Sequence, residues 1–156
     1  MVAYESLGTG VDVEWQKGTR VCMISTGLGD GTIIPCDIVK TTSTNTLTRV
    51  TYADRFVNVR GVVLLPEYGT ARHNTAIGSS RCCEVAESPC AFVHVRIAAG
   101  QETALRGHTV TISASYDGMA DIATSAGDKP QWRGKLYENH TQDNTYHKVR
   151  KIITCD

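Results

Sequence analysis

Cysteine is the residue type in this sequence that is best suited to chemistry. The segment SRCCEVAESPC holds three of the six cysteines close together, and the full set is Cys22, Cys36, Cys82, Cys83, Cys90 and Cys155. A thiol becomes a nucleophile when a histidine or a helix N-terminus lowers its pKa, but the residues around these thiols match no cysteine-hydrolase pattern. A nearby second thiol also competes by forming a disulfide. The even number of cysteines therefore favours structural disulfides over catalysis.

The cysteine spacing also suggests which thiols pair. Neighbouring residues of an extended backbone point to opposite sides, so the two adjacent cysteines are expected to take different partners. The predicted pairing is Cys22 with Cys36, one of Cys82 and Cys83 with Cys90, and the other with Cys155. Disulfides persist in oxidising surroundings, which predicts an extracellular or virion-surface location.

Metal binding and catalysis have weaker support. Cys83, Cys90 and His94 are zinc-type ligands, but their spacing departs from the paired knuckles of structural zinc sites. Asp-Gly pairs such as Asp117-Gly118 are typical of turns and lack the ligand run of a calcium loop. The five histidines accompany no nucleophile motif. We therefore expect no metal, no cofactor and no catalytic residue, and the protein is not expected to be an enzyme.

A second group of chemically useful side chains lies near the C-terminus, in KPQWRGKLYENHTQDNTYH. Aromatic rings mixed with amides and a carboxylate suit sugars, and the same composition is found in protein interfaces. The candidate ligand or interface residues are Trp132, Tyr137, Asn139, Asp143, Asn144 and Tyr146. The alternative is a polar loop between two strands whose aromatic rings cap the core.

Charge and hydropathy narrow the range of partners. Sixteen basic and sixteen acidic side chains give a formal net charge of zero, so no overall field attracts nucleic acid. No apolar run approaches the length of a membrane-spanning helix. The N-terminal MVAYESLGTG has neither a basic nor an apolar region of a signal peptide, so a signal is expected to be absent or already removed.

The elements that must position these residues are strands, because apolar residues recur mostly with period two. In segment 91–98, Val93, Val95 and Ile97 are expected to face the core, and the residues between them the wetter side. In segment 109–116 the expected core residues extend to Ala114, and a short helix is considered only for 119–126. The expected strands are 11–15, 21–23, 33–39 with an interruption at Pro35, 46–53, 56–65, 91–98, 109–116 and 146–154.

Short antiparallel strands joined by turns predict an all-β chain with little helix. The expected fold is a disulfide-stapled antiparallel β-sandwich of jelly-roll or immunoglobulin-like shape, with a barrel as the alternative. A length of 156 residues fits one domain spanning 1–156.

An all-β chain of this kind without a nucleophile motif, phosphate loop or cofactor fingerprint is typical of a binding or assembly module. Six cysteines without a signal fit a particle component whose thiols oxidise after release by lysis. The sequence therefore predicts a structural protein, such as a virion capsid or decoration component, that forms homo-oligomers and contacts other particle proteins. The alternatives are a secreted lectin or adhesin that binds glycans and, as the weakest, a small hydrolase.

Overall fold

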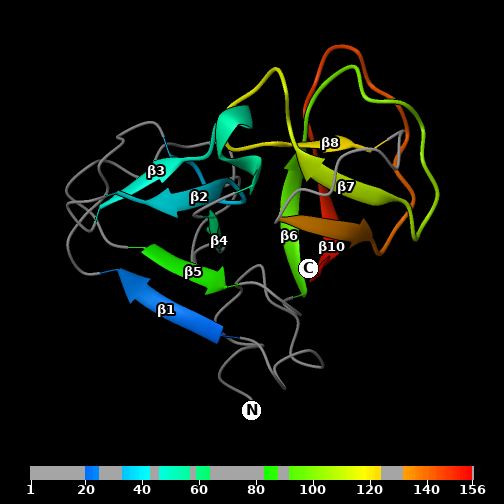
Figure 1. Cartoon of the computed structure of the whole chain (residues 1–156). Coiled ribbons are helices and arrows are strands. Elements are labelled where there is room, and N and C mark those ends of the chain that lie inside the picture. The colour runs from blue at the N-terminus through cyan, green and yellow to red at the C-terminus, as the bar shows by residue number, and fades with distance from the viewer. Residues whose placement is uncertain are drawn as a thin grey trace.

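The computed structural model of the chain describes residues 20–24, 33–42, 46–56, 59–63, 83–87, 92–123 and 132–155 (Figure 1). For residues 20–24, 56, 83, 84, 87 and 155 only the backbone is described. Within these residues the chain is mostly strand, and the single helix is the short 3-10 helix η2 (Tyr52–Phe56). The predicted all-β class with little helix is confirmed for this part of the chain.

The N-terminal half contributes an open five-stranded sheet. Its order is β1 (Arg20–Ile24), β5 (Cys83–Glu87), β4 (Val59–Val63), β2 (Ile38–Thr41) and β3 (Leu47–Arg49). Every neighbouring pair is antiparallel, and the register between β2 and β4 shifts between Val39 and Lys40. Val62 and Val63 are both fully buried although they point to opposite faces, so the sheet is covered on both sides.

The C-terminal half closes into a small barrel. The strand order is β10 (Lys148–Cys155), β6 (Phe92–Ile97), β8 (Ala120–Ile122), β7 (Thr109–Ile112) and β9 (Arg133–Leu136). Strand β10 closes the ring because its first part pairs with β6 and its last part with β9. The strand order does not show the predicted sandwich of two stacked sheets, because this second sheet closes on itself. A barrel was the alternative that the sequence left open.

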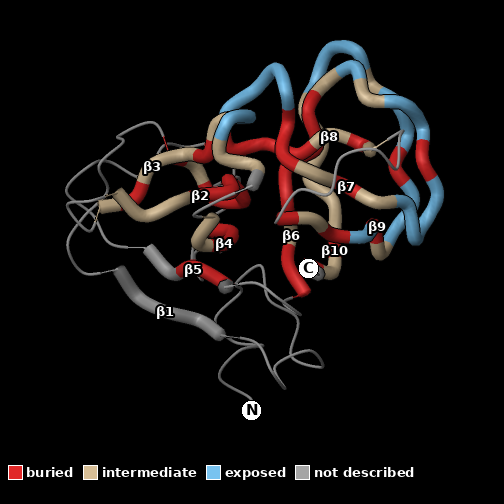
Figure 2. The backbone as a smooth tube through the Cα atoms, in the orientation of Figure 1, coloured by how far each residue is buried: buried red, intermediate tan, exposed pale blue. Residues whose placement is uncertain are grey.

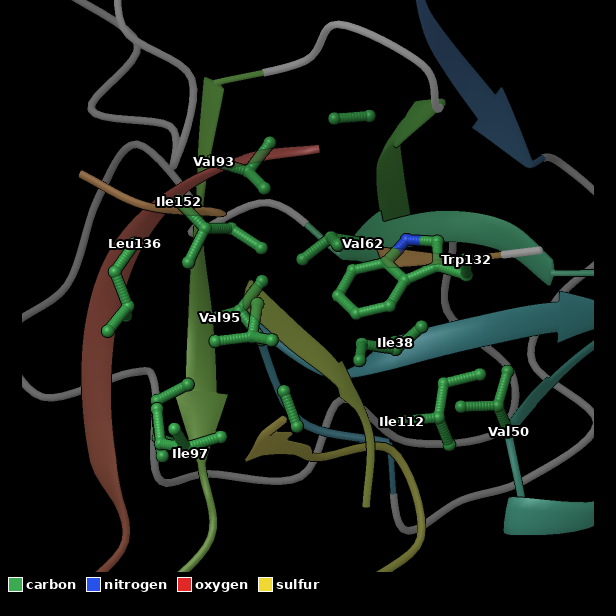
Figure 3. Close-up of a cluster of buried hydrophobic side chains, with 14 of the residues drawn as sticks. Ile38, Val50, Val62, Val93, Val95, Ile97, Ile112, Trp132, Leu136 and Ile152 are labelled. Atoms are coloured by element: carbon green, nitrogen blue, oxygen red, sulfur yellow. The ribbon is translucent and has the colours of Figure 1, made fainter. Parts of the chain in front are cut away.

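One hydrophobic core is shared by the sheet and the barrel. Ile38, Val50 and Val62 from the sheet side pack in the same cluster as Val95 and Trp132 from the barrel side. Figure 3 shows the Trp132 indole beside Val62 and Ile38, where the two halves meet. Most of the exposed residues among those described lie in the loops of the barrel (Figure 2).

Several local predictions are corrected by the structure. The chain turns at Pro35 and Cys36, so β2 begins only at Ile38. Predicted strand 46–53 ends at Arg49, and the Asp54 carboxylate then accepts hydrogen bonds from the backbone N–H of Thr51 (2.8 Å) and its hydroxyl (3.0 Å), starting η2. Segment 119–126, considered for a helix, contains strand β8.

The remaining differences concern strand ends and faces. Strand β7 ends at Ile112, so Ala114 is exposed rather than in the core. Val93, Val95 and Ile97 lie in the core as predicted, whereas Phe92 and Arg96 on the expected wetter face are also buried. Strands β5, β8 and β9 were not predicted, and predicted strand 11–15 lies outside the described residues.

The predicted Cys22–Cys36 disulfide is wrong, because Cys36 is a free thiol. Its side chain is buried in the turn before β2, and its φ of 73° lies in the left-handed region. Cys82 and Cys90 lie outside the described residues, and only the backbone is described for Cys22, Cys83 and Cys155. The disulfide staple is therefore not shown, and the pairings among Cys82, Cys83, Cys90 and Cys155 stay a prediction.

Gly118 offers a test of the junction between sheet and barrel. Its φ is 75°, and a Cβ there would lie 3.1 Å from side-chain carbons of Arg49 and Asp37 on the sheet side. We expect Gly118→Ala to lower the free energy of unfolding by about 2–4 kcal/mol, through backbone strain and crowding together. Urea denaturation measures the loss.

Gly107→Ala is the matched control. Gly107 also has a positive φ, 93°, but a Cβ there would meet nothing within 4 Å. This variant should therefore lose only the strain contribution, about 1–2 kcal/mol. Equal losses in the two variants would show that the contact of Gly118 with the sheet does not matter.

Candidate interaction surface

Two long barrel loops lie side by side and carry most of the predicted site residues. Segment 98–108 connects β6 to β7, and segment 137–147 connects β9 to β10 (Figure 1). Ala104 and His140 join them in an antiparallel bridge, with backbone hydrogen bonds of 2.9 Å and 2.8 Å. We call these two segments the paired loops, and their exposed side chains the paired-loop surface.

Further hydrogen bonds fix the paired loops to one another along their length. The Gly100 N–H donates to the Asp143 carbonyl oxygen (2.8 Å), and the Gln142 N–H donates to the Thr103 hydroxyl (3.0 Å). At the other end of the loops, the Arg106 N–H donates to the Asn139 side-chain oxygen (2.9 Å). The paired loops are therefore held by a ladder of specific bonds, although they contain no regular strand.

Asp143 shapes the turn that presents Tyr146. Its carboxylate accepts the backbone N–H groups of Tyr146 (3.0 Å) and Thr145 (2.8 Å), and it forms an ion pair with Lys148 (3.1 Å). Those two backbone bonds, followed by Lys148, lower the pKa of Asp143 to about 2. The carboxylate is therefore ionised at neutral pH and acts as a turn former rather than as a free ligand group.

Tyr137 is half-buried in a small stack on the barrel wall. Its ring meets the Phe92 ring edge-on with centroids 4.4 Å apart, and the Arg106 guanidinium lies 4.3 Å from the Tyr137 centroid. Arg106 comes from the other paired loop. The stack thus ties that loop to the barrel by cation–π and aromatic contacts.

The predicted candidate residues separate into exposed and buried groups. Asn139, Asn144 and Tyr146 are exposed on the paired-loop surface, and Tyr146 is 69% exposed. Trp132 is only 2% exposed and lies in the shared core. The prediction that Trp132 contacts a ligand or partner is therefore wrong, because its indole is packed in the core between the sheet and the barrel.

The sequence analysis missed the other half of this surface. Leu105 is 62% exposed, and Arg106 beside it is exposed as well. Both belong to segment 98–108, in which Arg106 lies 33 residues before Asn139, its hydrogen-bond partner in the other loop. The signal in the sequence was the long stretch between the expected strands 91–98 and 109–116, with Gly100 and Gly107 inside it.

Chemistry of other classes has little support within the described residues. No group of three or more His, Cys, Asp and Glu side chains that are described there gathers in a way that would hold a metal ion. Burial raises the pKa of the Cys36 thiol to about 12, against a lowering by Arg96, so this thiol is protonated at neutral pH. In the described part of the chain, no helix is long and apolar enough to cross a membrane.

Comparison with known proteins assigns no family. No protein-family model matches the chain, and no curated protein is significantly similar to it. Support for a function therefore comes from the chemistry of this chain's own residues.

The burial of Trp132 predicts the effect of its removal. Trp132→Ala should lower the free energy of unfolding by about 3–5 kcal/mol, because it leaves a cavity where sheet and barrel meet. Tyr146→Ala, which truncates an exposed ring, should change it by about 0.5 kcal/mol or less. Urea denaturation compares the two variants, and a Trp132→Ala protein as stable as the wild type would contradict the assignment of the indole to the core.

Proposed function

We propose that the protein is a non-enzymatic assembly protein, a capsid or decoration component of a virion, that self-associates through the paired-loop surface. Other particle proteins are its further partners, and the virion surface or extracellular space is its location. The observation that carries the proposal is the exposure of Leu105 and Tyr146 on loops that are already ordered by hydrogen bonds.

The two exposed apolar side chains lie toward opposite ends of the loop pairing. Leu105 is next to the end where Arg106 binds Asn139, and Tyr146 is next to the end where Asp143 binds Gly100. Exposed amides and hydroxyls lie between them on Thr141, Gln142 and Asn144. Apolar anchors within a polar surround are typical of protein interfaces, and ordered loops reduce the entropy lost on association.

The charge balance supports a second copy of the same chain as the partner. Sixteen basic and sixteen acidic residues give a net charge of zero, so copies do not repel one another as strongly charged monomers would. A homo-oligomer therefore needs no partner of opposite charge.

A carbohydrate-binding role is the second candidate, and one local arrangement favours it. The exposed Tyr146 ring lies two residues from Asn144, whose side-chain oxygen accepts a hydrogen bond from the Gln142 amide (3.1 Å). An aromatic ring beside fixed amides suits the C–H face and hydroxyls of a sugar.

The double variant Leu105→Ser/Tyr146→Ser tests self-association. Loss of two aromatic or aliphatic anchors should weaken association by about 2 kcal/mol or more, roughly 30-fold in Kd, measured by sedimentation at micromolar concentration. The matched control is Tyr52→Ser, which removes an exposed tyrosine from helix η2, away from the paired loops (Figure 1).

A glycan-binding screen on the same variants separates the two candidate functions. If the double variant keeps the wild-type mass and loses glycan retention, the protein is a lectin and the assembly proposal fails. If neither property changes, the paired-loop surface has neither role.

The proposal retains two disulfides, namely one of Cys82 and Cys83 with Cys90 and the other with Cys155. Of the six cysteines, these bonds use four and leave Cys22 and Cys36. Alkylation of the denatured, unreduced protein should therefore modify two thiols, read as a mass shift. Modification of all six in freshly isolated protein would remove the argument for an oxidising location.

A further inference from the structure

We propose that His140 and His147 lock the paired loops together only while both rings are neutral, so that mild acid opens the loops and weakens association. The loop opening is a property of the single chain. Its effect on association rests on the proposed function.

The His147 side chain binds segment 98–108 at the point where that segment leaves β6. Its Nδ1 accepts a hydrogen bond from the backbone N–H of Ala99 (2.9 Å), and its ring meets the Tyr116 ring edge-on at 4.7 Å. A nitrogen that accepts a hydrogen bond carries no proton. If Nδ1 were protonated, its N–H would face the Ala99 N–H, and this hydrogen bond between the loops would be lost.

His140 is buried at the centre of the same pairing. It is 1% exposed, and its backbone exchanges both hydrogen bonds with Ala104. Neither ring nitrogen has a hydrogen-bond partner among the residues that the structure describes. A proton on this ring would therefore be a buried charge without a partner, which is costly unless the loop opens to water.

Most of the charged groups around the two imidazole rings lower the pKa of the histidines. Burial, then the positive charges of Arg150 and Lys148 on β10, lower the pKa of His140. The Gln101 backbone carbonyl, which does not reach hydrogen-bond geometry, and the Asp143 carboxylate oppose them. Asp143 is already engaged with two backbone N–H groups and Lys148.

The surroundings of His147 have the same effect. Burial, and then the positive charge of Arg96 on β6, lower the pKa of His147, and the Tyr116 ring packs against the imidazole. The closed loops therefore favour the neutral form of both histidines.

The sign of the pH dependence follows from these lowered values. In open loops each histidine takes its ordinary pKa of about 6.5, so the open state binds more protons than the closed state at mildly acidic pH. The opening equilibrium constant should be constant above about pH 7.5 and rise as pH falls below about 6.5. Each histidine contributes at most about tenfold per pH unit, and both together about a hundredfold.

Hydrogen exchange measures this opening directly. The amides of Ala99, Gly100 and Ala104 donate across the paired loops, and they should become at least tenfold less protected between pH 7.5 and 5.0 after correction for intrinsic exchange. The Val63 amide, which donates to the Asp37 carbonyl oxygen in the sheet region, should keep its protection. Equal protection of the loop amides at both pH values would overturn the proposal.

Substitutions assign the effect to the two histidines. His147→Asn keeps an acceptor near the Nδ1 position without titrating, and His140→Phe fills the space of a ring that makes no hydrogen bond within the described residues. The double variant should lose the acid response of the loop amides, and His147→Asn alone should reduce it by up to tenfold per pH unit. An acid response as large as the wild type's in both proteins would overturn the proposal.

His108→Asn is the matched control. The Nδ1 of His108 accepts the Leu105 N–H within its own segment, so this ring does not join the two loops. The acid response at Ala99 and Ala104 should survive in this variant, and its disappearance would contradict the assignment to His140 and His147.

Sedimentation at pH 7.5 and 5.5 completes the test. The proposal is supported if acid opens the loops and the oligomer dissociates in the wild type but not in the His140→Phe/His147→Asn variant. If the loops open while the oligomer mass stays unchanged, the regulation of association is refuted. A protein that is monomeric at both pH values refutes the proposed function, and the exchange data then decide on the histidine lock alone.

Discussion

A buried ion pair joins the barrel to the sheet. Arg96 extends from β6 to the turn before β2, where its side-chain Nε lies 4.0 Å from the Asp37 carboxylate and its Nη2 donates to the Pro35 carbonyl oxygen (3.0 Å). The two side chains are 4% and 1% exposed. A buried charge without its partner is strongly destabilising, so each half of the structure requires the other in this position. Because β2 begins directly after Asp37, the pair fixes where the open sheet starts relative to the barrel.

Backbone hydrogen bonds extend this junction. Three backbone N–H groups donate in a cycle, each over 3.0 Å or less. The Ile38 N–H donates to the Gly118 carbonyl oxygen, the Gly118 N–H to the Val50 carbonyl oxygen, and the Val50 N–H to the Ile38 carbonyl oxygen. The turn that holds Cys36 in a left-handed conformation is anchored in the same way by two bonds to Val63. The space inside the junction is filled by apolar side chains, chiefly Trp132, whose indole N–H has no hydrogen-bond partner among the described residues.

The hydrogen bonds between the paired loops account both for the order of the loop surface and for its proposed sensitivity to pH. The surface that includes Leu105 and Tyr146 is ordered by a small number of hydrogen bonds between the paired loops rather than by regular strands, so a few groups determine whether it is formed. One of those groups is the His147 imidazole, and the His140 imidazole is buried beside the backbone bridge to Ala104. Imidazole is the side chain whose charge changes most readily near neutral pH. If the paired-loop surface serves association, the proposed histidine lock links that association to the acidity of its surroundings.

The sequence by itself determined the all-β class, because alternation such as that of Val93, Val95 and Ile97 identifies a strand and its core face from neighbouring residues alone. It also located the exposed Asn139, Asn144 and Tyr146, since a polar stretch between strands is solvated in almost any fold. Only the tertiary structure decided barrel closure, because β10 pairs with β6, which is remote in sequence, as well as with β9, the strand directly before it. The same holds for the burial of Trp132, the free thiol of Cys36 and the union of the two loops. Periodicity indicates which face of a strand is apolar, but it does not indicate which distant segment covers that face. The environments of Trp132, Cys36 and the paired loops depend on which distant segments pack against them.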